Sequence, residues 1–306
     1  MSRLSNAQLI YKILPYIPGG KVATYGQLGR LSGVKSPRVV GNILHKNPDA
    51  PGVPCHRVVT QDGRMGSNYA LGGPRAQEKR LQKEGVEIIN GRVNLAKHLW
   101  SSSKPLYLYI YLLSLWGPPG PWPWFGNGPA HTPEEIAIGA ILTQNTNWKN
   151  VEKVLCSLKA DGTCTIDGIC KLGAKNYIRL KELIRPSGYY NQKAKRLFEF
   201  CKFIVEEHKT LKNFLARKNA REELLALYGI GPETADAILL YAGNRPVFVV
   251  DAYTKRFAKH YDLTKETSYQ GLQNFLIENL PKDTKLFQDY HALIVKWGKD
   301  NKHLHS

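Results

Sequence analysis

One stretch in the second half of the chain reads Leu225-Ala226-Leu227-Tyr228-Gly229-Ile230-Gly231-Pro232-Glu233-Thr234-Ala235-Asp236. The pattern predicts a helix, a tight hairpin of glycine, hydrophobe and glycine, and a second helix. Two glycines allow backbone amides to approach a phosphate with no side chain in the way, and the N-terminus of the second helix adds a favourable dipole. We take Gly229, Gly231 and Thr234 as candidate contacts to a phosphate backbone. A Gly-x-Gly pair alone is also compatible with an ordinary helix turn.

An aspartate follows the hairpin in Val249-Val250-Asp251-Ala252-Tyr253. A carboxylate that comes after a buried apolar run, and directly ahead of another helix, is placed where a desolvated catalytic group could lie. Aspartate is also a common N-cap, and one residue can serve both purposes. Asp251 is therefore a candidate catalytic residue.

The second half of the chain is predicted to be all-α. Only residues 247–250 form a β-branched run typical of a strand, and this run is short. The helices are expected over residues 133–142, 148–158, 191–207, 220–227, 232–242 and 253–260.

The charge of the chain narrows the choice of partner. Of its 306 residues, 43 are Lys or Arg and 25 are Asp or Glu, and the net charge is +18. A surplus of this size implies a polyanionic partner, with nucleic acid as the leading candidate. We expect no transmembrane segment, because the longest apolar run, residues 106–116, is shorter than the roughly 18 residues that spanning requires. This run is predicted to be a buried helix.

Composition and cysteine usage also bear on the domain organisation and on the cellular location of the protein. The chain is 42% hydrophobic and 22% charged, as soluble proteins are. Residues 101–105, Ser-Ser-Ser-Lys-Pro, are the best candidate linker and give domains 1–100 and 101–306. The five cysteines are an odd number without a Cys-x-x-Cys pair, so we expect no disulfide framework and no metal site. This cysteine usage and the absence of an apolar signal at the N-terminus favour a reducing, intracellular location.

The first half is predicted to contain a helix-turn-helix and a reactive thiol. A turn at Gly33 is expected between the last two of three helices, over residues 7–16, 25–32 and 37–45. The stretch Val53-Pro54-Cys55-His56-Arg57-Val58-Val59 places a thiol beside an imidazole and a guanidinium. Cationic neighbours stabilise a thiolate, so Cys55 is expected to be more nucleophilic than a free cysteine. A buried, unreactive cysteine is the alternative.

Four linked motifs of the first half lie at residues 17–26, 36–41, 47–48 and 54–58. In order and spacing they resemble the active-site domain of the O6-alkylguanine-DNA alkyltransferases, across roughly residues 7–100. The resemblance implies a winged helix-turn-helix-like domain in which Cys55 accepts an alkyl group irreversibly. It also implies that His56 relays a proton through water to Glu84, and that Asn47 holds the active-site turn.

The same resemblance assigns three residues to DNA. Tyr25 would rotate the phosphate of the damaged nucleotide, and Arg57 would contact DNA. Arg38, near the start of the second helix of the helix-turn-helix, would fill the gap left by the extruded guanine. Extrusion is needed because the O6 atom of a stacked guanine is out of reach. The alternatives are a plain phosphate contact for Arg38 and ordinary packing for Tyr25.

The sequence departs from the transferase pattern in two ways. We expect no preceding N-terminal domain, and residues 66–73 match the loop around the lesion pocket only loosely. Residues 80–100 are similar to the alkyltransferase-like proteins. Those proteins bind alkylguanine but carry tryptophan in place of the cysteine, and they transfer nothing. Because Cys55 is present, we favour transfer, with non-catalytic lesion binding as the alternative.

The second half resembles the endonuclease III superfamily of helix–hairpin–helix DNA glycosylases, over about residues 116–300. Residues 142–146 and 185–195 look most like the iron–sulfur-free 3-methyladenine DNA glycosylases of that superfamily. The resemblance makes Asp251 the catalytic carboxylate, which stabilises the sugar cation or orients the attacking water. Glu233 stands where the bifunctional lyases have a Schiff-base lysine, so we expect a monofunctional glycosylase.

The resemblance also implies a base pocket. Trp148 and either Trp122 or Trp124 match its aromatic residues, and Glu233 would line it. A cation between aromatic faces is favoured by roughly 0.5–2 kcal/mol, which suits a methylated purine. Lys299 matches a lysine that bears a carbamate. No cysteine follows the last helix, so we expect no iron–sulfur cluster and no other cofactor.

The combined expectation is a mainly α, two-domain protein of DNA alkylation repair. One half would remove O6-alkyl groups by transfer to Cys55, and the other would excise N-alkylated bases such as 3-methyladenine. The partner would be double-stranded DNA with alkylated bases, bound by a monomer. A purely structural DNA-binding role for the second half is the alternative to excision.

Overall fold

The computed structural model describes residues 3–47, 52–120, 123 and 130–301. Its contacts divide the chain into two compact units, residues 1–118 with 279–281, and residues 119–278 with 282–306. Residues 101–118, which we expected in the second domain, belong to the first unit. The reason is that helix α6, Lys104–Trp116, packs the buried ring of Tyr109 edge-on against Tyr16, with 6.1 Å between the ring centroids.

The first unit contains the predicted helix-turn-helix, formed by α2 (Tyr25–Ser32) and α3 (Pro37–His45), after α1 (Asn6–Ile13) and η1 (Leu14–Tyr16). Local chemistry sets the ends of these helices. The hydroxyl of Thr24 caps the N-terminus of α2, and Gly33 ends this helix in the left-handed conformation, with φ 73°. The proline at position 37 suits the first turn of α3, where its missing N–H is not needed.

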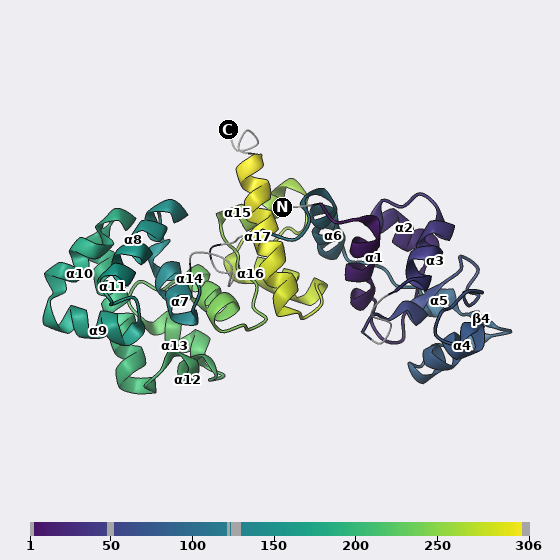
Figure 1. Ribbon diagram of the computed structural model, residues 1–306, viewed down its shortest axis with the longest axis horizontal. Helices are drawn as coiled ribbons and strands as arrows, with labels where there is room; N and C mark the ends of the chain where they lie inside the picture. The colour runs from purple at the N-terminus through teal and green to yellow at the C-terminus, as the bar shows by residue number, and fades with distance from the viewer. Residues whose placement is uncertain (1–2, 48–51, 121–122, 124–129, 302–306) are drawn as a thin grey trace. The chain divides into compact units, whose positions relative to one another are not determined.

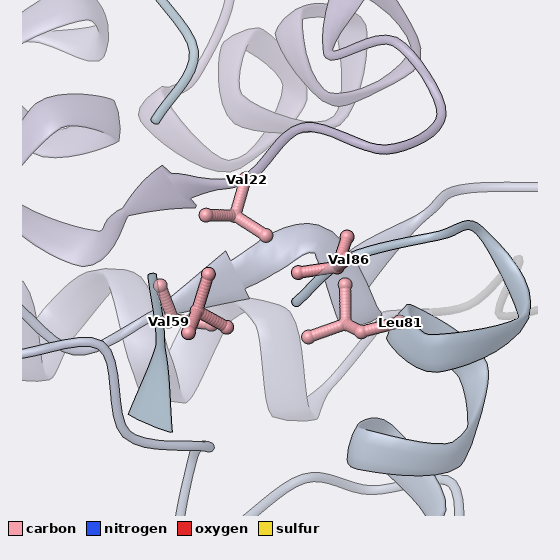
Figure 2. Packing of buried hydrophobic residues seen from close by; sticks show 5 residues of the cluster. Val22, Val59, Leu81 and Val86 are labelled. Atoms are coloured by element: carbon pink, nitrogen blue, oxygen red, sulfur yellow. The ribbon is translucent and has the colours of Figure 1, made fainter. Parts of the chain in front are cut away.

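Short strands and a small apolar core complete the first unit. β1 (Ala23–Thr24) pairs in parallel with β2 (Val58–Val59), and β3 (Ile88–Ile89) pairs antiparallel with β4 (Arg92–Val93) as a wing. The other elements are η2 (Cys55–Arg57), α4 (Gly73–Lys83) and α5 (Leu95–His98). Figure 2 shows the side chains that converge between these elements, and the buried cluster comprises Val22, Val59, Leu81, Val86 and Val93. The core therefore includes Val59 of β2, the strand that directly follows the η2 turn with Cys55.

In the described residues of the second unit, every regular element is a helix, and loops connect them (Figure 1). Threonine, asparagine and aspartate side chains cap several of its helices, with Thr132 before α7, Asn147 before α8 and Asp251 before α15. The elements are α7 (Pro133–Leu142), α8 (Trp148–Ala160), α9 (Ile166–Lys175), α10 (Tyr177–Ile184), η3 (Arg185–Ser187), α11 (Tyr190–Phe203), η4 (Ile204–His208), α12 (Leu211–Leu215), α13 (Ala220–Ala226), α14 (Pro232–Ala237), η5 (Ile238–Ala242), α15 (Ala252–His260), α16 (Tyr269–Asn279) and α17 (Thr284–Asp300).

The strand-like run 247–250 is extended but pairs with no strand in the described part of the chain. Its side chains from Phe248 to Val250 are buried, and side chains of other helices satisfy its backbone. None of the helices in the described ranges combines the length and the apolar character needed to cross a lipid bilayer.

Candidate functional sites

Cys55 lies at the first position of η2 and faces a cavity of about 70 Å³. Tyr25, from the N-terminus of α2, and Asn47, just after α3, line the same cavity, and the loop 68–71 closes it. Gly66 allows Tyr25 to sit there, because a Cβ at this glycine would lie 2.3 Å from the phenol oxygen. Three of the predicted site residues, Cys55, Asn47 and Tyr25, are thus brought together.

The thiol of Cys55 is buried and has one side-chain donor. The Nδ2 atom of Asn47 lies 3.1 Å from its Sγ atom. Burial raises the pKa of Cys55 above the ordinary cysteine value, and the hydrogen bond from Asn47 opposes this only in part. We expected cationic neighbours to stabilise the thiolate. In the structure His56 and Arg57 direct their side chains to Glu84 instead, and the greater reactivity of Cys55 stays a prediction.

Glu84, which follows α4, binds both residues that come after Cys55. The Nε2 atom of His56 lies 2.8 Å from Oε1, and the Arg57 guanidinium donates to both carboxylate oxygens at 2.7–3.1 Å. Burial would raise the pKa of Glu84, but these donors and their charges lower it to about 2. We expected His56 to reach Glu84 through water, whereas the structure places the two side chains in direct contact.

Arg57, predicted to contact DNA, makes several contacts within the first unit, and its contact with DNA stays a prediction. Besides the ion pair with Glu84, its Nη1 atom donates to the backbone oxygen of Ile17 at 2.7 Å. Nε, Nη1 and Nη2 each donate inside the unit, and Arg57 thereby holds the η2 turn against the end of η1. Arg38, by contrast, is exposed at the second position of α3, where a side chain can reach DNA.

Asp251 is the N-cap of α15, and both of its carboxylate oxygens have partners. Oδ1 accepts the N–H of Thr254 at 2.7 Å, and Oδ2 lies 3.4 Å from Nε2 of His291. The side chain is 13% exposed. Burial acts to raise the pKa of Asp251, but His291 and the Thr254 amide outweigh it and hold the pKa below the usual range. The site therefore presents an ionised carboxylate at neutral pH.

His291 is a site residue that the sequence reasoning missed. It is buried on α17, and its Nδ1 atom lies 2.7 Å from the hydroxyl of Tyr241. A histidine inside the apolar run of residues 290–295 is the signal that could have indicated it, since such a ring needs polar partners.

Glu233 lies on α14 near enough to Asp251 for their charges to interact. Partial desolvation and the charge of Asp251 raise the pKa of Glu233. Trp148 is the half-buried first residue of α8, and its place in a base pocket stays a prediction. Lys299 is exposed in the last turn of α17. Trp122 and Trp124 lie outside the described residues.

The predicted hairpin precedes α14 and is held by Gln144. The Nε2 atom of Gln144 donates to the backbone oxygen of Gly229 at 2.9 Å and to Oγ1 of Thr234 at 3.0 Å, and Arg196 holds its Oε1 at 2.6 Å. Thr234 is buried and its hydroxyl anchors the hairpin through Gln144, while its contact with DNA stays a prediction. Gly231 is open, with no atom within 4 Å of a Cβ built there.

A metal site is not evident in the described ranges, where no three His, Cys, Asp or Glu side chains are grouped to hold an ion.

Two family models match the chain. One, described as the DNA-binding domain of 6-O-methylguanine DNA methyltransferase, matches residues 5–86. The other, the HhH-GPD superfamily of base-excision DNA repair proteins, matches residues 138–282.

Relatives are found for both units. An inferred DNA repair glycosylase of Methanocaldococcus jannaschii is 44% identical over 200 residues, which cover 63% of this chain and 86% of that protein. Alkyltransferase-like protein 1 of Schizosaccharomyces pombe is 36% identical over 98 residues, or 30% of this chain and 90% of that protein. A bifunctional methyltransferase/endonuclease of Picrophilus torridus is 40% identical over 101 residues, and this chain spans only 33% of its length.

Among solved structures, the H. pylori 3-methyladenine DNA glycosylase bound to 1,N6-ethenoadenine is similar. Its TM-score is 0.53 at 32% identity, and the match covers 62% of this chain and 93% of that chain.

Proposed function

Because the chain belongs to the HhH-GPD superfamily of base-excision DNA repair proteins and carries an alkyltransferase DNA-binding domain, we propose that it repairs alkylated DNA by two separate reactions. The first is alkyl transfer from O6-alkylguanine to Cys55. The second is hydrolytic excision of N-alkylated bases, of the 3-methyladenine type, with Asp251 as the catalytic carboxylate.

The observation that supports transfer is the meeting of Cys55, Asn47 and Tyr25 in one cavity. In the reaction the Cys55 sulfur, after losing its proton, bonds to the alkyl carbon. The bond from that carbon to O6 breaks, and the guanine leaves with a proton. Incubation with duplex DNA that contains O6-methylguanine should add the mass of one methylene to the peptide with Cys55. An unmodified peptide after full binding would exclude transfer.

A non-catalytic lesion sensor is the second candidate, and the raised pKa of Cys55 favours it. A buried thiol that stays protonated is a poor nucleophile. The same incubation distinguishes the two functions, because a sensor would bind the damaged duplex tightly, release it unchanged and gain no mass.

The observation that supports excision is the half-buried, ionised carboxylate of Asp251, whose charge interacts with that of Glu233 on α14. A fixed negative charge stabilises the cation that develops on the sugar as the bond to the base breaks, and water then completes the cleavage. Release of free 3-methyladenine from methylated DNA, abolished by Asp251→Asn, is the expected result. If no base is released, the second unit has only the structural DNA-binding role.

We propose a monofunctional glycosylase, because Glu233 cannot form a Schiff base. One amine of this unit, Lys193, has a pKa lowered to about 8 by burial and by Arg196. It is buried, however, and donates to the backbone oxygens of Leu142 and Ser187 at 2.9 and 2.7 Å. Borohydride should therefore trap no covalent adduct with damaged DNA, and a trapped adduct would show lyase chemistry.

A further inference from the structure

A fully buried carboxylate, Asp236, lies on α14 three residues after Glu233. Its oxygens accept four hydrogen bonds. Arg221 donates from Nε and Nη2 at 2.7 and 3.0 Å, the Tyr269 hydroxyl donates at 2.8 Å, and Nε2 of Gln273 donates at 2.7 Å. A buried charge is tolerated only when it is paired and hydrogen-bonded, and Asp236 meets both conditions.

Two of these donors also hold the extended segment that leads to Asp251. Nε2 of Gln273 donates its second hydrogen to the backbone oxygen of Phe248 at 2.7 Å. The oxygen of Tyr269 accepts the N–H of Val250 at 3.4 Å. Both residues belong to α16. The side chains of this helix therefore supply the backbone hydrogen bonds that a neighbouring strand would supply in a sheet.

A residue after Asp251 holds the same segment. Thr254, whose N–H binds Oδ1 of Asp251, donates its hydroxyl to the backbone oxygen of Val249 at 3.3 Å. Side chains of α15 and α16 thus fix the backbone that leads to the carboxylate. The two residues of α16 that hold this segment also donate to Asp236, which is on the same helix as Glu233.

We propose that Asp236 and Tyr269 are positioning residues, which fix Asp251 and Glu233 relative to each other through one buried network. The inference rests on the proposed excision function. A displacement of about 1 Å of a reacting group can cost roughly 100-fold in rate, so the network would act on the chemical step and not on DNA binding.

The test is Tyr269→Phe in the full-length chain, which removes one hydroxyl. Excision of 3-methyladenine in a single turnover should slow about tenfold or more, while the affinity for the damaged duplex stays unchanged. Tyr177→Phe, the same change on the distant α10, should leave both quantities as they are. Gln273→Met provides a second variant if the first unfolds, and thermal melting reports folding.

A separate readout does not depend on activity. Loss of the Tyr269 hydroxyl should speed hydrogen exchange at the amide of Val250. One outcome would overturn this inference alone: the wild-type protein excises 3-methyladenine, and Tyr269→Phe shows the same excision rate and the same hydrogen exchange at Val250. A wild-type protein that releases no base would overturn both the inference and the proposed excision function.

Discussion

The sulfur of Cys55 lies in a small cavity where Asn47 donates a hydrogen bond to it. Because burial raises the pKa of this thiol, we expect its reactivity toward iodoacetamide to rise at a pH above that of an ordinary cysteine. Asn47→Ala removes a donor that stabilises the thiolate, and should move the midpoint still higher. Peptide mass spectrometry across a pH series measures this, with the exposed Cys156 as an internal reference. A midpoint below that of free cysteine would mean that cations activate Cys55 after all.

The Glu84 ion pair predicts a specific pH dependence of stability. The pKa of Glu84 is lowered in the folded state from 4.5 to about 2. A group with a lowered pKa stabilises the fold above its unfolded value, and this stability is lost as the pH falls from 4.5 towards 2. Glu84→Gln should therefore cost about 2 kcal/mol at neutral pH, since Arg57 loses its counter-charge, and clearly less at about pH 3.

Calorimetric melting of wild type and variant at the two pH values measures the effect. Glu87→Gln is the control, because its ion pair with Lys97 is exposed and should contribute less than about 0.5 kcal/mol at either pH. An equal cost of Glu84→Gln at both pH values would contradict the assigned ion pair.

Arg38 can be tested between its two roles. If its side chain fills the gap left by an extruded guanine, Arg38→Ala should weaken binding to the O6-methylguanine duplex more than to an undamaged duplex. If it contacts a phosphate, both affinities should fall equally, and the slope of affinity against salt should drop by about 1. Lys35→Ala, a nearby exposed cation before α3, serves as the comparison.

Single residues also show how far sequence reasoning reaches. Cys55, Asn47 and Asp251 could be predicted because their motifs are specific. The directions of Arg57 and Thr234 could not, since each is decided by a distant partner, Glu84 or Gln144. Arg57 is two residues from Cys55 in the sequence, but in the fold its guanidinium pairs with the carboxylate of Glu84.

At the scale of elements, the hairpin before α14 allows a matched pair of glycine substitutions. Gly229 has φ 74°, and a Cβ there would lie 2.2 Å from Nε of Arg196. Gly229→Ala should therefore cost about 1–2 kcal/mol for the left-handed conformation, and more if Arg196 loses its bond to Gln144. Gly231 has φ −91° and open space, so Gly231→Ala should leave the melting temperature unchanged.

DNA affinity separates the two glycines further. If a phosphate approaches the hairpin backbone, the methyl group of Gly231→Ala should weaken duplex binding without any loss of stability. Gly229→Ala should lower both the affinity for the duplex and the stability of the protein. Wild-type affinity of Gly231→Ala, measured by fluorescence anisotropy, would show that no phosphate comes close to this residue.

Helices with strong local signals were predicted to within a few residues. α2, α3 and α7 match their expected ranges because a cap residue or a proline marks each start. Other features depend on tertiary packing. The run 247–250 reads as a strand, but no partner strand exists beside it in the described structure, and α16 satisfies its backbone instead. The helix α6 has no local signal that would assign it to the first unit.

At the scale of the whole molecule, the net charge of +18 suits both units to the same polyanion. Each unit has its own buried core, and each contains the candidate catalytic groups of its proposed reaction. Cys55, Asn47 and Glu84 belong to the first unit, and Asp251 and His291 to the second. Neither set borrows a described side chain from the other unit.

This independence predicts that the two reactions can be lost one at a time. Cys55→Ser should abolish methyl transfer, because it removes the sulfur that accepts the methyl group. It should leave the excision rate of 3-methyladenine within about twofold, because the first unit keeps its fold. Asp251→Asn should do the reverse, with a loss of excision of at least roughly 100-fold if the carboxylate stabilises the sugar cation. Cys156→Ser, at an exposed position, controls for the loss of a thiol and should change neither reaction. One duplex with both lesions, followed by mass spectrometry of the protein and of the released base, measures both at once. A large effect of either substitution on the other reaction would show that the units depend on each other on DNA.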